Sequence, residues 1–407
     1  MKVLVLNSGS SSQKSCLYEI GGFLPDDPPA CLWQAKVEWN GETAESAIKL
    51  GNGIEKKERI KMSSRSDVVE RLLQSLWNGE TRAVASAAEI DVVGHRVVHG
   101  GPHFEDPVFV TAEVKSAIAG VSAFAPLHNR AELQGMEIVE KLLGEVPQVA
   151  VFDTGFHKHM PISAAIYPGP YEWFESGIRR YGFHGINHKY CARRAARLLG
   201  REAASLRLVS CHLGNGCSLA AIQNGKSVDT TMGFTPLEGL MMGTRSGSVD
   251  PGILTYLVRQ KNLTGEQLDD VLNKRSGLLG ISGVSEDMRE ILAAIKNGNE
   301  RAQLAFDIYV HRLRSGIGAM IAVLGGIDGL IFTAGVGENS AEVRAASCES
   351  LGYAGIKLDA KKNAKSPVDA EIGAADSKAR VLIVRAQEDW EIARSCWDLM
   401  RKSPAIP

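Results

Sequence analysis

Four apolar segments of the chain run directly into loops that contain glycine. They are VLVLNSGSSS from residue 3, DVVGHRVVHGG from residue 91, LRLVSCHLGNGCS from residue 206 and DGLIFTAGVGENS from residue 328. Continuous apolar runs are typical of strands buried on both faces of a sheet, and helical patterns such as SDVVERLLQSLWNG lie between them. The alternation predicts an α/β fold. The first and third segments lie about half a chain apart, which indicates two structurally related halves.

Strands that end in glycine loops are typical ligand-binding places in α/β proteins. Backbone N–H groups approach an anion closely where no side chain intervenes, and serine hydroxyls add further donors. The segment NSGSSSQK (7–14) therefore predicts a phosphate cradle, in which its serines donate hydrogen bonds and Lys14 supplies a cation. The alternative is a serine-rich surface turn.

Size, charge and cysteine usage limit the classes of protein to consider. The chain has 407 residues, which predicts two domains because one domain usually holds roughly 100 to 200 residues. Lys and Arg number 46 against 47 Asp and Glu, so no excess positive charge favours nucleic acid or an anionic membrane, and a small-molecule partner is expected. The seven cysteines form no C-x-x-C pair, which predicts reduced thiols and a cytoplasmic location.

Seven segments that span nearly the whole chain carry the glycine, arginine and histidine motifs. They are NSGSSSQK (7–14), GHRVVHGG (94–101), FDTGFH (152–157), RRYGFHG (179–185), HLGNGCS (212–218), DTTMGFTPLEGLMMGTRSG (229–247) and AGVGEN (334–339). In these motifs and in their order the chain resembles the acetokinase family. The resemblance implies two related ribonuclease-H-like α/β domains of the sugar kinase, heat-shock ATPase and actin type around a central cleft, and a homodimer. We expect an N-terminal domain of residues 1–152 plus 386–407 and a nucleotide-binding domain of residues 153–385.

The resemblance implies an acetate kinase, which transfers phosphoryl reversibly from ATP to acetate by direct in-line displacement, giving acetyl phosphate and ADP. Acetate is already ionised at neutral pH, so the reaction needs cations and donors to bring two anions together more than it needs a base. A propionate kinase, or another short-chain carboxylate kinase, is the alternative within this class. A nucleotide-gated chaperone or actin-like protein is the alternative from another class.

The resemblance to the acetokinase family implies that four residues in these motifs are catalytic. Arg96 is expected to contact acetate and the phosphoryl group, and Arg245 to stabilise the transition state, because a guanidinium fork suits carboxylate and phosphoryl oxygens. His184 is expected to donate a hydrogen bond to the transferred group. Asp153 follows an apolar run, and its role stays open between orienting Arg96 and exchanging a proton. Outside these motifs, each residue type has a structural alternative. The arginines could be solvated surface charges, His184 could be a buried histidine bonded to a backbone carbonyl, and Asp153 could cap a helix.

The implied cofactor is Mg²⁺, with Mn²⁺ as an alternative, and the implied metal ligands are Asn7 and Glu388. Magnesium takes few protein oxygens and keeps several waters. The segment VRAQEDWEIA (384–393) departs here from the family, which reads closer to P-T-N-E-E. Glu388 is retained, but its surroundings differ, so the metal affinity is in question.

The resemblance also implies which residues bind the two substrates. The residues expected to bind the carboxylic acid are Arg96, Val98, Leu127, Phe183 and Pro236. The residues expected to bind ATP or ADP are Lys14, His212, Leu213, Gly214, Asn215, Gly216, Asp287, Met288, Arg289, Gly335, Val336, Gly337, Glu338 and Asn339. Val98 narrows the acid pocket and so favours acetate over propionate modestly. Met288 stands where an aromatic residue is common in the family, which is expected to loosen one wall of the adenosine pocket.

Overall fold

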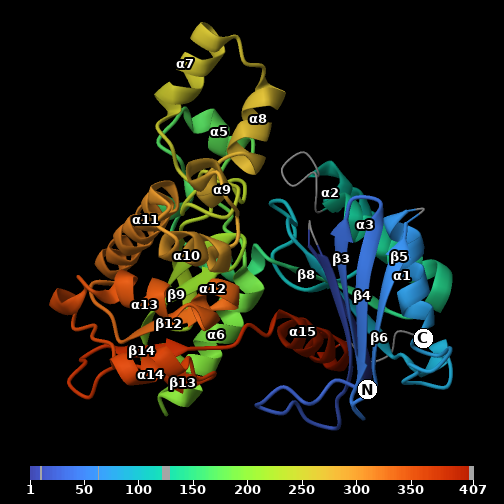
Figure 1. The fold of residues 1–407 in the computed structure, drawn as a ribbon. Helices are drawn as coiled ribbons and strands as arrows, with labels where there is room; N and C mark the ends of the chain where they lie inside the picture. Colours follow the sequence, from blue (N-terminus) through green and yellow to red (C-terminus); the bar gives the residue numbers. More distant parts are fainter. Residues whose placement is uncertain (10–11, 63, 122–128, 403–407) are drawn as a thin grey trace. The chain divides into compact units, whose positions relative to one another are not determined.

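A computed structural model describes residues 1–9, 12–62, 64–121 and 129–402. The chain divides into two compact units, Met1–Gly155 with Gln387–Pro407, and Phe156–Ala386. Figure 1 shows that each unit is built on its own β-sheet. The boundaries expected from the sequence lie within three residues of these divisions.

The first unit contains an eight-stranded sheet in the order β5-β4-β3-β2-β1-β6-β8-β7. Its strands are β1 (Lys2–Ser8), β2 (Ser12–Glu19), β3 (Trp33–Asn40), β4 (Thr43–Leu50), β5 (Glu55–Lys61), β6 (Val92–Val97), β7 (Val108–Phe109) and β8 (Gln148–Phe152). β1 pairs in parallel with β6, and β6 with β8, so that Leu6 lies opposite His95 and Arg96 opposite Val151. This register brings the carboxyl ends of three parallel strands to one edge of the sheet.

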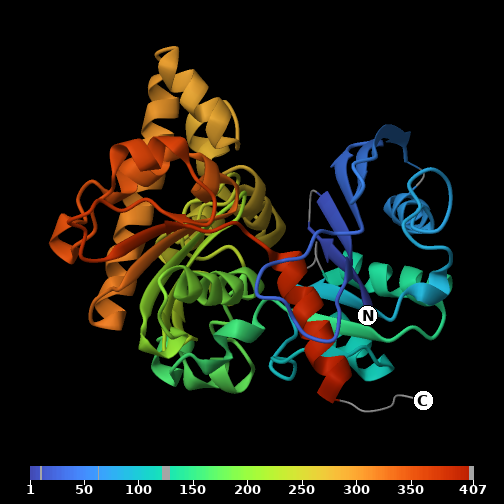
Figure 2. The same cartoon turned by 90° about the horizontal axis from the view of Figure 1, so that it is seen from below.

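Helices cover the sheet of the first unit. They are α1 (Arg65–Gln74), α2 (Ala112–Gly120), α3 (Asn129–Leu143) and α15 (Glu388–Lys402), with a short 3₁₀ helix at Ala87–Glu89. α15 lies against β1 and β6 (Figure 2). The contact needs a glycine at position 94, because a Cβ there would lie 2.6 Å from Cys396 Sγ and 2.7 Å from Ile392 Cγ2. The close packing fixes the start of α15, and therefore Glu388, relative to β1.

The second unit contains a six-stranded sheet in the order β11-β10-β9-β12-β14-β13. Its strands are β9 (Arg207–Leu213), β10 (Cys217–Gln223), β11 (Lys226–Thr230), β12 (Gly329–Thr333), β13 (Ala370–Glu371) and β14 (Arg380–Ile383). Its helices are α4 (Ile162–Ala165), α5 (Tyr171–Glu175), α6 (Gly185–Leu198), α7 (Pro251–Lys261), α8 (Gly265–Lys274), α9 (Gly277–Ser282), α10 (Met288–Lys296), α11 (Glu300–Leu324), α12 (Ala334–Asn339), α13 (Ala341–Cys348) and α14 (Ala360–Lys365), with 3₁₀ turns at Gly155–His159, Ala203–Ser205 and Gly352–Ala354.

The two sheets repeat one pattern of pairing. In the first, β1 pairs antiparallel with β2 and parallel with β6, and β8 follows in parallel. In the second, β9 pairs antiparallel with β10 and parallel with β12, and β14 follows in parallel. The order β3-β2-β1-β6-β8 therefore corresponds to β11-β10-β9-β12-β14. The predicted α/β fold with two related halves is confirmed.

Within the described ranges, none of the helices combines the length and the apolar character that a membrane span requires.

Candidate active site

Asn7, Arg96 and Asp153 meet at the carboxyl ends of β1, β6 and β8. Arg96 donates from Nη2 to Asp153 Oδ2 at 2.5 Å and from Nε to Oδ1 at 3.2 Å, which is a two-pronged ion pair. Arg96 Nη1 donates to Asn7 Oδ1 at 3.2 Å. The Asp153 side chain is 1% exposed and that of Arg96 13%. The guanidinium is thus held in one orientation by its neighbours on both sides.

The charge of Arg96 is kept in spite of burial. Burial lowers the pKa of Arg96, but the nearby Asp153 and Glu388 carboxylates raise it by more, and the net shift is upward. Of the two roles left open for Asp153, orienting Arg96 is the one for which the structure provides a contact. A carboxylate at this edge would repel bound anions if it were alone, and its pairing with Arg96 removes that repulsion.

Glu388 lies at the first position of α15 and contacts Asn7. Asn7 Nδ2 donates to Glu388 Oε2 at 3.0 Å and to Asp389 Oδ1 at 2.9 Å. Asp389, one of the residues that depart from the family pattern, also accepts a contact from the Cys16 thiol at 3.5 Å. Burial raises the pKa of Asp389, and the Lys14 charge opposes that shift. The altered segment therefore places a second carboxylate on the Asn7 amide.

Amide and carboxylate oxygens are the ligands that a hard divalent ion prefers, so Asn7 and Glu388 fit a magnesium site in their chemistry. In the described part of the chain there is no cluster of three or more His, Cys, Asp or Glu residues suited to hold a metal. A site with few protein ligands suits magnesium, which usually keeps several waters and takes its other oxygens from substrate phosphates.

Glu132, which the sequence analysis missed, lies beneath the strand that carries Arg96. Both its carboxylate oxygens accept the backbone N–H of Val98, at 3.1 and 3.2 Å. Burial raises the pKa of Glu132 to about 8, although Arg96 and the Val98 N–H lower it. A signal was present in the sequence, because Glu132 stands on the same stripe of α3 as the buried Met136 and Val139.

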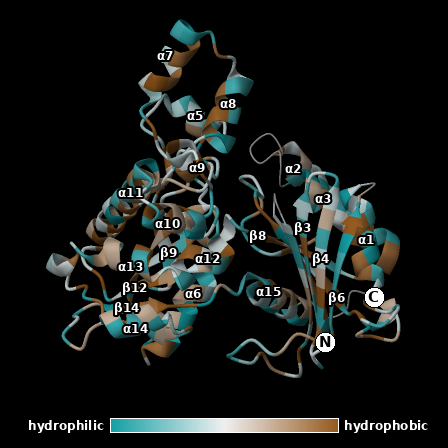
Figure 3. Ribbon diagram, in the orientation of Figure 1, coloured by the Kyte–Doolittle hydropathy of each residue, from teal (hydrophilic) through white to brown (hydrophobic). Residues whose placement is uncertain are grey.

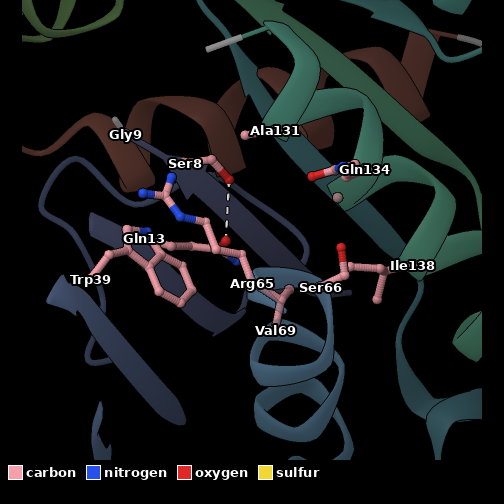
Figure 4. A pocket seen from close by; sticks show the side chains of 11 residues that line it. Ser8, Gly9, Gln13, Trp39, Arg65, Ser66, Val69, Ala131, Gln134 and Ile138 are labelled. Atoms are coloured by element: carbon pink, nitrogen blue, oxygen red, sulfur yellow. Dashed lines mark hydrogen bonds between the residues drawn. The ribbon is translucent and has the colours of Figure 1, made fainter. Parts of the chain in front are cut away.

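In the segment NSGSSSQK, β1 continues to Ser8 and β2 begins at Ser12, and the two strands pair antiparallel. Lys14 is exposed on β2 and lies opposite Asn7 in the strand register. Ser10, Ser11 and the expected substrate residue Leu127 lie outside the described residues. Ser8 and Gly9 line a cavity of about 30 Å³ between β2, α1 and α3 (Figure 4), which has room for about one water. Figure 4 also shows Arg65 beside Trp39 at its edge.

In the second unit, His184 and Arg245 face the glycine loop between β9 and β10. A Cβ added to Gly216 would lie 3.4 Å from His184 Nε2 and 3.6 Å from Arg245 Nη1. His184 has a left-handed backbone conformation, with φ 57°, directly before α6. Its ring stacks on the His212 ring, with 3.9 Å between the ring centroids and an interplanar angle of 11°. A histidine, a guanidinium and bare backbone therefore converge on one short loop.

Arg245 is bound much more loosely than Arg96. Its Nη1 donates to the carbonyl of Pro236 at 3.5 Å, and burial lowers the pKa of Arg245. No carboxylate of the described residues forms an ion pair with it. The nearby Phe183 is buried, and its carbonyl accepts a hydrogen bond from His157 Nε2 at 3.0 Å.

The glycine loop is closely packed at Asn215. A Cβ at Gly243 would lie 2.2 Å from Asn215 Oδ1, so a larger residue there would displace the Asn215 side chain. Gly214 lies next to the His212 ring, since its added Cβ would be 3.5 Å from His212 Nε2. Leu213 is fully buried at the end of β9 and anchors the loop to the core.

The expected nucleotide residues Gly335, Val336, Gly337, Glu338 and Asn339 form the helix α12 instead of an open loop. The chain turns into α12 through Ala334, whose φ is 65°. The buried Arg344, which the sequence analysis missed, donates to the carbonyls of Gly337 and Glu338 at 2.8 and 2.9 Å. Glu338 accepts the backbone N–H of Ala386 at 2.9 Å.

The expected ribose and base residues begin α10. Asp287 caps the helix through the backbone N–H of Arg289 and pairs with its guanidinium at 2.5 Å. Met288 is buried at 3% exposure, so its side chain packs into the unit. The Arg289 side chain is exposed.

Comparison with known proteins gives one consistent result. Residues 2–394 match the model of the Acetokinase family. An acetate kinase of Cyanothece sp. is 59% identical over 98% of this chain and 99% of its own length, and one of Nostoc sp. is 59% identical over 99% and 100%. The crystal structure of Porphyromonas gingivalis acetate kinase is 43% identical with a TM-score of 0.88, covering 98% of this chain and 99% of that one. A propionate kinase structure from Francisella tularensis is 36% identical with the same TM-score, covering 97% and 98%.

Proposed function

The chain belongs to the acetokinase family and transfers phosphoryl between ATP and acetate, and we propose that the two clusters described above divide that work. The first cluster, Asn7, Arg96, Asp153 and Glu388, handles the carboxylate and the metal. The second, His184, Arg245 and the loop after β9, handles the phosphoryl group. Family membership also removes the chaperone and actin-like alternatives.

Arg96 is the residue that binds acetate and then the phosphoryl group, and Asp153 positions it. The fork between Asp153 and Arg96 supports this assignment, because a guanidinium that is already oriented loses less entropy when it binds a carboxylate. Acetate is already an anion and attacks without losing a proton, so this cluster needs no general base. The backbone N–H of Val98 is anchored by Glu132. Val98, Phe183, Pro236 and Leu127 are the residues proposed to contact the methyl group of the acid, and Leu127 lies outside the described residues.

Asn7 and Glu388 hold the divalent metal that the family implies, and we propose Mg²⁺, with Mn²⁺ as a substitute. When bound, the ion neutralises charge on the β- and γ-phosphates of ATP. Asn7 offers its Oδ1 and Glu388 its carboxylate, and Arg96 and Asp389 keep the Asn7 amide in place.

His184 and Arg245 stabilise the charge that spreads over the transferred phosphoryl oxygens in the in-line displacement. The convergence of His184 Nε2 and Arg245 Nη1 on Gly216 supports this role. The nucleotide is bound in part by the backbone of the β9–β10 loop. The full set of residues proposed to bind it is Lys14, His212, Leu213, Gly214, Asn215, Gly216, Asp287, Met288, Arg289, Gly335, Val336, Gly337, Glu338 and Asn339.

We propose that the enzyme prefers acetate over propionate. Val98 is buried at 3% exposure and fixed by its backbone, which limits the room for another methylene. Propionate kinase is the second candidate because a propionate kinase structure is 36% identical. One assay decides between them: hydroxylamine trapping of the acyl phosphate from acetate, propionate and butyrate, with and without magnesium. We expect turnover to fall in that order and to need the metal; faster turnover of propionate would contradict the preference.

We also propose that the protein is a cytoplasmic homodimer. Its seven cysteines are free thiols, as expected in a reducing compartment. Neither α7 nor α8 contains a buried residue, and Figure 3 shows hydrophobic stretches on both. Val249, Ile253, Tyr256 and Val258 expose 38 to 56% of their surface there. A second copy is expected to cover this surface, so Tyr256→Glu should shift the mass found by sedimentation from two chains to one, and a monomeric wild-type chain would refute the dimer.

A further inference from the structure

Ser218 connects the buried His188 to His184, and Ser210 on the neighbouring strand contacts the other ring nitrogen of His188. Ser218, on β10, lies 2.9 Å from His184 Nδ1 and 2.8 Å from His188 Nε2. Ser210, on β9, lies 2.9 Å from His188 Nδ1. Ser210, Ser218 and His188 are fully buried. The four side chains form one hydrogen-bonded row that ends at the ring proposed to face the phosphoryl group.

The direction of this row follows from counting protons. Burial lowers the pKa of His188 well below its usual value, so the ring is neutral and has one donor and one acceptor nitrogen. Each serine hydroxyl supplies one proton. The row therefore has only two consistent arrangements, one in which every proton points toward His184 and one in which every proton points away from it.

Ser210 distinguishes the two arrangements. Among the residues that the structure describes, its hydroxyl has no hydrogen-bond partner other than His188 Nδ1. If the protons pointed away from His184, His188 would donate to Ser210, and the Ser210 proton would be buried without an acceptor. A buried donor without an acceptor is strongly disfavoured, because it loses its hydrogen bond to water and gains none in the protein. The favoured arrangement has Ser210 donating to His188, His188 to Ser218, and Ser218 to His184 Nδ1.

His184 then carries its proton on Nε2, the nitrogen next to Gly216. The stacked ring of His212 is held in the same way, because its Nδ1 accepts from Asn187 Nδ2 at 2.9 Å. The Asn187 amide is itself fixed, since its Oδ1 accepts from the Cys191 thiol and its Nδ2 also donates to Thr333. Both stacked rings therefore direct an Nε2–H toward the glycine loop.

We infer that Ser210, His188 and Ser218 are positioning residues that hold His184 as its Nε2–H tautomer, so that a neutral ring donates a hydrogen bond to the transferred phosphoryl group. The role of His184 toward the phosphoryl group rests on the proposed function. The other tautomer would direct a lone pair at an anionic oxygen, which is repulsive. None of the three residues needs to touch a substrate.

The tautomer can be observed directly in the full-length protein. Histidine labelled with ¹⁵N gives different shifts for protonated and unprotonated ring nitrogens, and His184→Gln assigns the signals. We expect a protonated Nε2 and an unprotonated Nδ1 in the wild type. Ser210→Ala should move both shifts toward their average, because neither arrangement then satisfies His188 Nδ1, and Ser210→Thr should restore them. Ser347→Ala is the matched control, since Ser347 is a buried serine of the same unit that bonds to the α13 backbone.

Turnover should follow the tautomer. Ser210→Ala is expected to lower kcat about twofold, as about half of the molecules carry each tautomer, and Ser218→Ala about tenfold, with KM for ATP unchanged in both. A protonated Nδ1 in the wild type, or unchanged shifts in Ser210→Ala, would overturn the inference even if Ser218→Ala fails to fold. A wild type that makes no acetyl phosphate would instead refute the proposed function and leave the tautomer result valid.

Discussion

Two arginines of the proposed active site differ in how they are held. Arg96 donates two hydrogen bonds to the Asp153 carboxylate and one to Asn7 Oδ1, and Glu388 and Glu132 lie near enough to raise its pKa. Arg245 has one long contact to a carbonyl, and no described carboxylate pairs with it. The charged Arg96 guanidinium is paired with a carboxylate and oriented by it, whereas the half-buried Arg245 guanidinium has no ion pair among the described residues. A fixed group suits the binding of a ground-state carboxylate, whereas an uncompensated charge suits the oxygens on which charge develops.

The largest effect is expected from the uncompensated arginine. Arg245→Ala should lower kcat about 10³-fold while KM for ATP stays within about twofold, because the lost interaction is made mainly in the transition state. Initial rates of acyl phosphate formation measure this. Arg201→Ala removes a surface arginine of the same unit and should have no effect. Unchanged turnover in Arg245→Ala would remove Arg245 from the mechanism.

The next largest effect is expected from the ion pair that orients Arg96. Asp153→Asn removes the negative charge but keeps one oxygen that can accept a hydrogen bond from Arg96. Because Arg96 then loses part of its orientation, kcat/KM for acetate should fall about 10- to 100-fold. Asp328→Asn, which weakens the surface pair with Arg207, is the matched control. If acetate kinetics were the same in Asp153→Asn and wild type, Arg96 would not need its carboxylate, and the contrast with Arg245 would lose its meaning.

Glu388 tests the metal side of the oriented cluster. Glu388→Gln should raise the magnesium concentration needed for half-maximal rate about tenfold, since a neutral amide is a weaker ligand for a hard cation. Titration of the rate with magnesium gives this value, and Glu140→Gln, which alters a surface pair on α3, serves as the control. An unaltered magnesium requirement would argue against Glu388 as a ligand.

The smallest effect concerns stability near Arg96. Burial raises the pKa of Glu132 to about 8 in the folded chain, whereas the unfolded chain has the ordinary value. Between about pH 4.5 and 8 the folded state therefore binds more protons than the unfolded state, and this contribution to stability decreases as pH rises. Glu132→Gln should flatten the fall of Tm across that range and keep an acceptor for Val98. A slope identical to that of the wild type would show that Glu132 is not buried in its protonated form.

Part of this contrast was predictable from the sequence. The apolar runs that precede Asn7 and Asp153 predict strand ends, and the parallel register then brings those residues to one edge with Arg96. The sequence left open whether Asp153 orients Arg96 or exchanges a proton, because the ion pair depends on which rotamers the edge of three strands allows. Glu132 and Ser210 were missed for a related reason: each acts on the site through a neighbour, and a motif in the sequence does not record such indirect contacts.

Local patterns were also outweighed by longer-range contacts. The glycines of AGVGEN indicated an open loop, but the segment is helical as α12, with Arg344 binding the carbonyls of Gly337 and Glu338. Here bonds to a residue elsewhere in the unit decide the structure. The cradle predicted for the serine-rich segment after β1 stays a prediction, because Ser10 and Ser11 lie outside the described residues, while Lys14 lies on β2 opposite Asn7.

The central claim is that Arg245 acts on the transition state and Arg96 on the ground state. Calorimetric titration can separate them by measuring Kd for MgATP, for acetate and for a planar fluoroaluminate complex with ADP and acetate that mimics the phosphoryl in flight. For Arg245→Ala we predict a loss of about 10³-fold in affinity for the mimic alone, with Kd for MgATP and acetate within about twofold of the wild type. Equal losses for the mimic and for MgATP would contradict the account.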